Sequence, residues 1–112
     1  MNQTTARTFW SVQHLVLVTL LPGDALTAGT VLGRIGASGK FRALTPSAHD
    51  GAQVAAAVLL RDAGASESDR FAEIPLQADV RGEAVVWPEG MTDEQKTKAL
   101  GELRARNIRV RR

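Results

Sequence analysis

The chain has 112 residues, with 14 Lys and Arg against 12 Asp and Glu, and it contains no cysteine. This length supports a single domain, and the absence of cysteine excludes disulfide cross-links and thiol chemistry. The net charge of +2 is smaller and less clustered than the imbalance that nucleic-acid-binding domains usually carry.

The first residues predict an arm. They are mostly small and polar and show no periodicity, so we predict a flexible N-terminal arm over residues 1–12 and a single β-rich domain over residues 13–112. Phe9 and Trp10 are two of only five aromatic residues in the chain (three Phe, two Trp). Two interpretations remain open. These side chains fold back onto the core of the same subunit, or they anchor the arm to a partner, as buried aromatic residues do at interfaces.

A strand is predicted over residues 12–21, and it ends at the turn Pro22-Gly23-Asp24. Its apolar run, Leu15–Leu21, is too short to span a bilayer, which takes about 20 helical residues. Only Arg7 is basic upstream of the run, whereas a signal peptide begins with a positively charged segment. We therefore interpret the run as a buried strand and not as a targeting sequence.

A hairpin is predicted next, because Val31–Ile35 and Lys40–Leu44 flank the loop Gly36-Ala37-Ser38-Gly39. The loop lacks the Gly-Lys-Ser/Thr ending of a phosphate-binding loop. The run Val54–Leu60 is apolar throughout, so periodicity alone cannot separate helix from strand. Its shortness and the β-branched Val58 favour a strand buried on both faces. Its three alanines indicate close packing, for which the C-terminal helix is the expected neighbour.

Residues 71–80 alternate as a strand, and Pro75 within them predicts an edge strand, since proline cannot donate to a β-ladder. The segment Glu83–Val86 predicts the following strand. After it, Trp87-Pro88-Glu89-Gly90 interrupts regular structure, because proline fixes its own φ and restricts the residue before it. We expect a corner formed by Trp87, Pro88 and Glu89.

The clearest local pattern is a capped helix. Thr92 is placed as its N-cap, with Gln95 three residues later completing a capping box. Asp93 and Glu94 fall in the first turn, where the helix dipole favours negative charge. An apolar stripe at helical spacing follows, formed by Ala99, Leu100 and Leu103.

A final strand is predicted after Asn107, since Ile108 and Val110 alternate with two arginines that would face outward. Five arginines gather in this segment, yet no aromatic residue is interleaved with them as in a single-strand nucleic-acid platform. An acidic protein surface is an equally suitable partner. The cluster consists of Arg104, Arg106, Arg109, Arg111 and Arg112.

No catalytic, cofactor-binding or metal-binding set is recognisable. His14 and His49 are far apart, and neither has a second ligand at metal-site spacing. Ser11, Ser38 and Ser66 lie in no nucleophile-elbow context. We therefore predict a protein that is not an enzyme and that has no cofactor, no metal and no small-molecule substrate.

Several segments, in this order and spacing, resemble a known family. They are Ala28–Ile35, Ala37–Lys40, His49–Leu60, Val80–Glu83, and Trp87–Gly90 followed by Thr92–Lys96. From about Leu26 to Val110 the chain resembles the head decoration proteins of tailed phages, the family typified by the lambda head protein D.

The resemblance implies a mainly β, β-clip-like fold of short strands with one C-terminal α-helix. It implies a homotrimer, made in the cytoplasm of the host bacterium, that binds the major capsid protein on the outer surface of the virion. There it would occupy threefold and quasi-threefold positions of the expanded capsid and stabilise the shell against internal DNA pressure. It implies no reaction, no nucleic-acid partner and no membrane.

In this family the N-terminal arm becomes ordered by adding a strand to a coat-protein sheet, which is a known mode of recognition. The arm of this chain departs from the family pattern because it is short and carries two adjacent aromatic residues. We expect the corner at Trp87 and Pro88 to be buried and to lie near the trimer axis. We also expect removal of residues 1–12 to leave the core folded and to abolish capsid binding. The candidate capsid-binding residues are Thr4, Arg7, Phe9, Trp10 and Val12.

Two alternatives come from other functional classes. One is a small β module that binds carbohydrate or an acidic partner. The other is a basic nucleic-acid accessory protein that uses residues 104–112, whose binding would show a steep dependence on salt.

Overall fold

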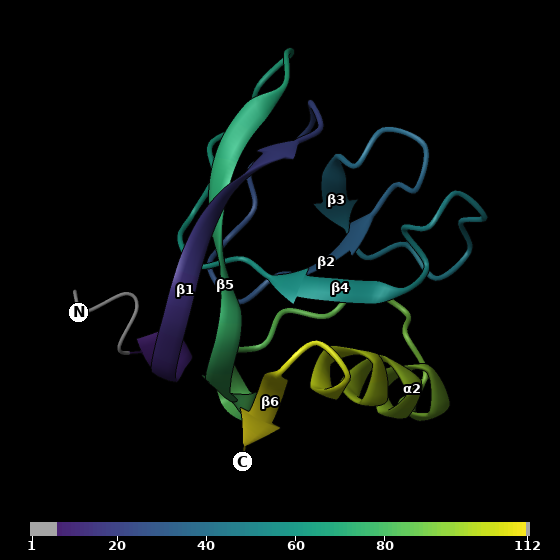
Figure 1. Ribbon diagram of the computed structural model, residues 1–112. Helices are drawn as coiled ribbons and strands as arrows, with labels where there is room; N and C mark the ends of the chain where they lie inside the picture. Colours follow the sequence, from purple (N-terminus) through teal and green to yellow (C-terminus); the bar gives the residue numbers. More distant parts are fainter. Residues whose placement is uncertain (1–6, 112) are drawn as a thin grey trace.

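The computed structural model describes residues 7–111, a mainly β body with six strands and the C-terminal helix α2 (Figure 1). The predicted class, a β fold with one C-terminal helix, is confirmed. Two strands are 12 residues long, so the expectation of short strands holds only for the other four. In chain order the elements are β1 (Phe9–Leu20), β2 (Val31–Arg34), β3 (Phe41–Ala43), β4 (Ala55–Val58), β5 (Arg70–Arg81), a 3-10 turn (Gly82–Ala84), α2 (Asp93–Arg104) and β6 (Ile108–Arg111).

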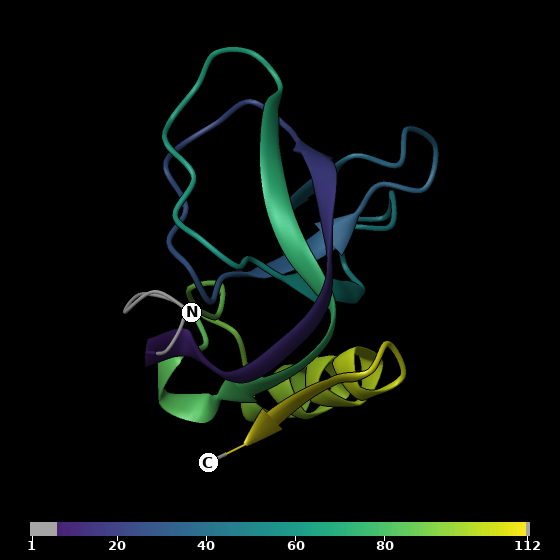
Figure 2. The same cartoon turned by 60° about the vertical axis from the view of Figure 1, so that its left-hand side comes forward.

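The six strands form one sheet in the order β4-β2-β3-β1-β5-β6. Strands β1 and β5 form a long antiparallel ribbon, which joins β3 through the single parallel pair Leu20 and Phe41. The smaller strands therefore turn sharply away from the ribbon (Figures 1 and 2). At the far end of the sheet the chain returns to the ribbon, where the Leu60 N–H donates to the Glu73 carbonyl at 3.1 Å. The sheet is thus nearly closed, and α2 packs against its two outermost strands, β4 and β6.

The ribbon packs against two hydrophobic clusters, one after the other along its length. Before His14 it packs on a cluster shared with α2 and β6, through Phe9 and Val12. After His14 it packs on a second cluster shared with β2, β3 and β4, through Val16 and Leu20. His14 itself has φ of 57°, which is uncommon for a residue with a Cβ atom. The backbone therefore departs from regular strand geometry where the ribbon passes from one cluster to the other.

Helix α2 forms as predicted. The Gln95 N–H donates to Thr92 Oγ1 at 3.1 Å, and the Thr92 N–H donates to Gln95 Oε1 at 2.9 Å, which completes the capping box. The helix also covers β4, which is a buried strand as expected, and Glu102 Oε1 accepts a hydrogen bond from the Ala55 N–H at 3.0 Å. A free edge group of β4 is thereby satisfied. No helix among residues 7–111 is long and apolar enough to cross a membrane.

The prediction that Pro75 places its strand at an edge is wrong, because β5 lies between β1 and β6. The pairing explains how proline is accommodated. Strand β6 pairs only with Ala78–Arg81, so at Pro75 the strand has a ladder partner on one side only, where it lies opposite Leu15. A missing N–H is tolerated there because no second ladder requires it.

The predicted strand Glu83–Val86 is also wrong. Residues Gly82–Ala84 form a 3-10 turn, and Val86 makes only an isolated bridge with Thr30. Both sides of β5 near this turn are already occupied, by β1 and by β6. The chain after Gly82 therefore cannot pair back onto β5 and crosses to the start of β2 instead.

Arg70 connects the loop that follows β1 to the loop that precedes β5, at the outer end of the ribbon. Its guanidinium donates to the carbonyls of Leu21 at 2.6 Å, Asp24 at 2.9 Å and Gly64 at 2.8 Å. We expect Arg70→Lys to lower the free energy of unfolding by about 1.5–3 kcal/mol, since one ammonium cannot reach all three acceptors. Urea denaturation measures the change. The matched control Arg61→Lys should change little, because Arg61 makes only an exposed 4.0 Å pair with Glu73.

Candidate interaction surfaces

The strand that follows the predicted arm begins earlier than expected. Strand β1 starts at Phe9, so residues 9–12 belong to the sheet and pair with β5. Phe9 is 1% exposed and packs in the first cluster, with Val12 partly buried beside it. Of the two interpretations of Phe9, its burial matches the one in which it folds onto its own subunit. Arg7 is exposed, and Thr4 lies outside the described residues.

Trp10 behaves differently from its neighbour. The register shifts between Phe9 and Ser11, which places a bulge at Trp10, and bulges re-aim side chains. The indole is 51% exposed, and the Arg81 guanidinium carbon lies 3.4 Å from its ring centroid. This cation–π contact holds a large aromatic surface in a defined orientation at the surface. A preoriented aromatic residue costs little side-chain entropy when a partner covers it.

One edge of β1 is open along almost its whole length. On one side the strand pairs with β5, and on the other it pairs with β3 only at Leu20. Among residues 7–111, no strand therefore pairs with residues 9–19 on that side. Such an edge is a template for a strand of another chain. In the sequence, the predicted arm precedes and overlaps the start of this strand.

The outer face of the ribbon carries exposed apolar side chains beside Glu73, which lies opposite Leu17, and this corrects the interpretation of Leu15–Leu21 as a buried strand. Only one face is covered: Leu17 is 65% exposed and Leu15 is also exposed. On β5, Phe71 lies opposite Thr19, diagonal to Leu17, and is 75% exposed. Diagonal neighbours on one face of a ribbon are within reach of long side chains. We call the exposed surface formed by Leu15, Leu17 and Phe71 the ribbon face.

The predicted corner forms a second apolar surface. Trp87 is partly buried and packs against the first cluster, Pro88 is half-buried, and Glu89 is exposed. Trp87 and Pro88 line a hollow of about 210 Å³ together with the exposed Val86 and the loop residue Leu26. We call this surface the corner hollow. The corner residues are thus partly buried in the subunit and partly available to a neighbour.

The titratable side chains of the described residues form no cluster suited to metal binding. His14 and His49 are both exposed, and no group of three or more His, Asp or Glu side chains among residues 7–111 is placed to hold a metal ion. Arg109 and Arg111 lie on the outward face of β6 as predicted, and Arg111 Nε is 3.4 Å from Asp79 Oδ2. What the described surface offers is contact with other macromolecules: an open strand edge and two apolar surfaces.

Comparison with known proteins identifies the family. The sequence model of the family described as bacteriophage lambda head decoration protein D matches residues 14–108. The matched range includes the ribbon face and the corner but neither the first 13 residues nor the last four. No curated protein matches the chain significantly. The matched family is a structural one, associated with the phage capsid, and is not an enzyme family. Because the match covers most of the length of the chain, the chain belongs to the family of the phage lambda head decoration protein D.

Proposed function

We propose that this protein binds as a homotrimer to the outer surface of the expanded phage capsid, at threefold and quasi-threefold positions, and stabilises the shell against internal DNA pressure. The protein would be made in the host cytoplasm and bind the major capsid protein. The family match over residues 14–108 is the observation that carries the proposal. The open strand edge and the exposed apolar surfaces support it, because a decoration protein acts only through contacts.

In this proposal the N-terminal segment makes the capsid contact. The segment before Phe9 precedes β1 in the sequence, and the edge of β1 away from β5 has no strand partner before Leu20 among residues 7–111, so a coat-protein strand can pair with this edge. Trp10 and Arg7 are exposed at this end, whereas Phe9 and Val12 face the core. The side chains assigned to the capsid contact are therefore Trp10 and Arg7, together with residues 1–6.

The proposed trimer needs two different surfaces on each subunit, because a closed ring with threefold symmetry is built from heterologous contacts. The ribbon face and the corner hollow are two separate apolar surfaces. We infer that the ribbon face of one subunit packs against the corner hollow of the next. Trp87 and Pro88 would then lie at the contact between subunits, next to Phe71 of the neighbour.

Shell binding tests the proposal as a whole. Purified protein is sedimented with empty shells before and after expansion. We expect cosedimentation with expanded shells only, and it should saturate at one trimer per threefold or quasi-threefold position. Equal binding to both kinds of shell would contradict the assigned position, and binding to neither would contradict the assigned function.

The trimer contact is tested with Phe71→Lys on the ribbon face and Val86→Lys at the corner hollow. Both side chains are exposed, so each variant should stay folded and sediment as a monomer. An equimolar mixture should form dimers, because one undamaged contact remains between the two variants. Ser47→Lys, in an exposed loop, is the matched control and should remain trimeric. Trimeric behaviour of both variants, or no association in the mixture, would contradict the assigned contact.

A further inference from the structure

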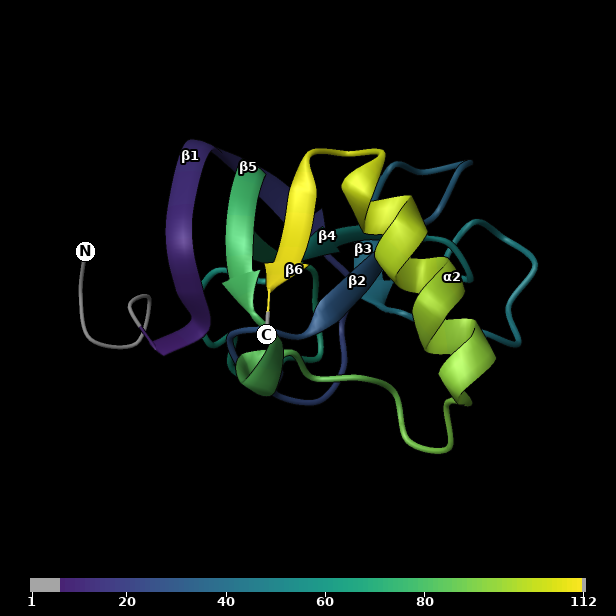
Figure 3. The same cartoon turned by 90° about the horizontal axis from the view of Figure 1, so that it is seen from below.

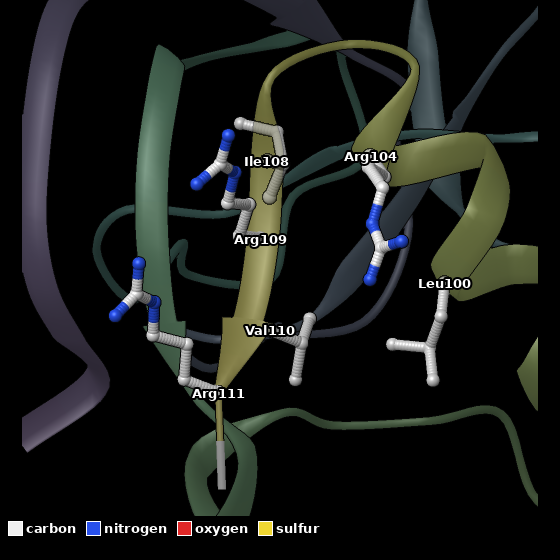
Figure 4. A pocket seen from close by; sticks show the side chains of 6 residues that line it. All are labelled: Leu100, Arg104, Ile108, Arg109, Val110 and Arg111. Carbon is white, nitrogen blue, oxygen red and sulfur yellow. The ribbon is translucent and has the colours of Figure 1, made fainter.

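Helix α2 lies beside β6 on the side of β6 that faces away from β5 (Figure 3), and residues of both elements line a groove. One hollow in it, of about 390 Å³, is lined by Leu100 and Arg104 from the helix and by the four residues of β6. A second, of about 410 Å³, shares Leu100 and Val110 and continues toward Trp87 and Lys96. Leu100 and Val110 face each other across the groove (Figure 4). These two apolar side chains therefore line both hollows.

The main chain of β6 is open toward this groove. The Asn107 carbonyl accepts from the Ala78 N–H at 3.1 Å and so points to β5. The N–H of Ile108 belongs to the same peptide unit and points the opposite way. Because the pattern repeats every second residue, the N–H and C=O groups of Ile108 and Val110 both face the groove. Among residues 7–111, β6 pairs with no strand other than β5.

The charge at the groove is positive. Arg104 extends along it from the end of α2 (Figure 4), and neither Arg104 nor Arg109 forms a salt bridge with any residue between 7 and 111. Lys96 lines the second hollow, where Glu83 is the one carboxylate. Residues 1–12 of the chain contain no acidic side chain, so charge disfavours the arm of another copy as the occupant.

We propose that the groove binds an extended acidic segment of another protein, which adds to β6 as a further strand. Its main chain would pair with Ile108 and Val110, its apolar side chains would lie on Leu100, and its carboxylates would meet Arg104. Edge addition supplies affinity through main-chain bonds, and alternate side chains supply specificity. The site lies on β6 and α2, away from β1, so it is independent of the capsid contact proposed for the arm.

The experiment uses the full chain and a short fluorescein-labelled peptide of alternating Glu and Val, with binding followed by anisotropy. We expect binding that weakens with salt and no binding of the same peptide with Lys in place of Glu. Arg104→Glu should weaken binding about tenfold or more. Arg106→Glu makes the same charge change in the exposed turn outside the groove and should have a much smaller effect.

Edge pairing is tested with Val110→Pro. The N–H that this variant lacks faces the groove, so the ladder with β5 is kept, and proline is tolerated in such edge positions. The control Val110→Ala removes the side chain but keeps the N–H. Cooperative thermal unfolding should show that both fold, and only the proline variant should lose peptide binding. Equal binding by the two would overturn the proposal, as would equal effects of Arg104→Glu and Arg106→Glu. A different outcome would assign the groove to nucleic acid instead. In that case the peptide does not bind, duplex DNA does, and DNA binding is lost in Arg104→Glu but kept in Val110→Pro.

Discussion

Phe9→Ala is expected to lower the free energy of unfolding by about 3–5 kcal/mol, the cost typical of removing a buried phenylalanine. Removal of residues 1–7 is expected to cost less than about 1 kcal/mol, since the first residues of a domain generally contribute little to its stability, and yet to abolish binding to expanded shells. Phe9 is 1% exposed in the first cluster, whereas the residues before it would supply the coat contact. Urea unfolding and shell cosedimentation measure the two effects separately.

The burial of Phe9 argues against the expectation that residues 1–12 can be removed without harm to the core. Such a truncation deletes Phe9 and the pairing of residues 9–12 with β5, so loss of shell binding could reflect unfolding. Trp10→Ala is the informative control, because the indole is half exposed and its loss should weaken shell binding more than stability. A Phe9→Ala protein as stable as the wild type would contradict the assignment of Phe9 to the core.

Elements with a local cause could be predicted from the sequence. The capping residues Thr92 and Gln95 bracket the start of α2 and form the two hydrogen bonds expected of them. The hairpin of β2 and β3 was predictable because glycines mark both ends of its loop. The family resemblance was carried by short segments of this kind, and the match to residues 14–108 confirms it.

Strand order could not be predicted in the same way, because it depends on which segments pair with the two sides of each strand. Pro75 indicated an edge strand, but β6 begins only opposite Ala78, after Pro75, so β5 can be an interior strand without a conflict. Residues 83–86 carry strand-forming side chains, but β6 and β1 already occupy both sides of β5. In both cases a segment distant in sequence decided the pairing.

The candidate surfaces were only partly predictable. The sequence indicated that Phe9 and Trp10 make important contacts, but the bulge at Trp10 determines which of the two side chains is exposed. The alternating run at Leu15 and Leu17 is apolar on both faces of the strand, and the sequence cannot say that a single subunit covers only one of them. A strand apolar on both faces in a chain with a small core is itself a signal that a partner covers the second face.

Gly33→Ala is expected to destabilise the fold by about 3 kcal/mol or more, the upper range for overpacking a close-packed site. Gly33 lies within β2, and an added Cβ would come within 2.6 Å of Ala52 Cα and 2.7 Å of the Ala52 carbonyl carbon. Both are backbone atoms, so no side-chain rotation can relieve the clash. Thermal and urea unfolding measure the loss, and Gly64→Ala is the matched control.

The control should act with the opposite sign. Gly64 has no atom within 4 Å of an added Cβ, so alanine there should stabilise by up to about 1 kcal/mol through the unfolded chain. If both variants cost the same, the contact between β2 and the turn at Ala52 would not be as close as described.

The position of Gly33 also explains why two of the segments that resemble the family occur together. Gly33 belongs to the segment 28–35 and Ala52 to the segment 49–60, and they meet backbone to backbone. Gly51, with φ of 111°, makes the same kind of approach to Arg34, where an added Cβ would come within 2.9 Å of Gly36 N. These glycines let β2 lie directly on the turn that leads into β4. Gly33→Ala should therefore displace β4 and with it α2, which packs on β4, so the Glu102 to Ala55 hydrogen bond should be lost together with overall stability. Amide hydrogen exchange at Ala55 would detect this even in a fraction of molecules that remains folded.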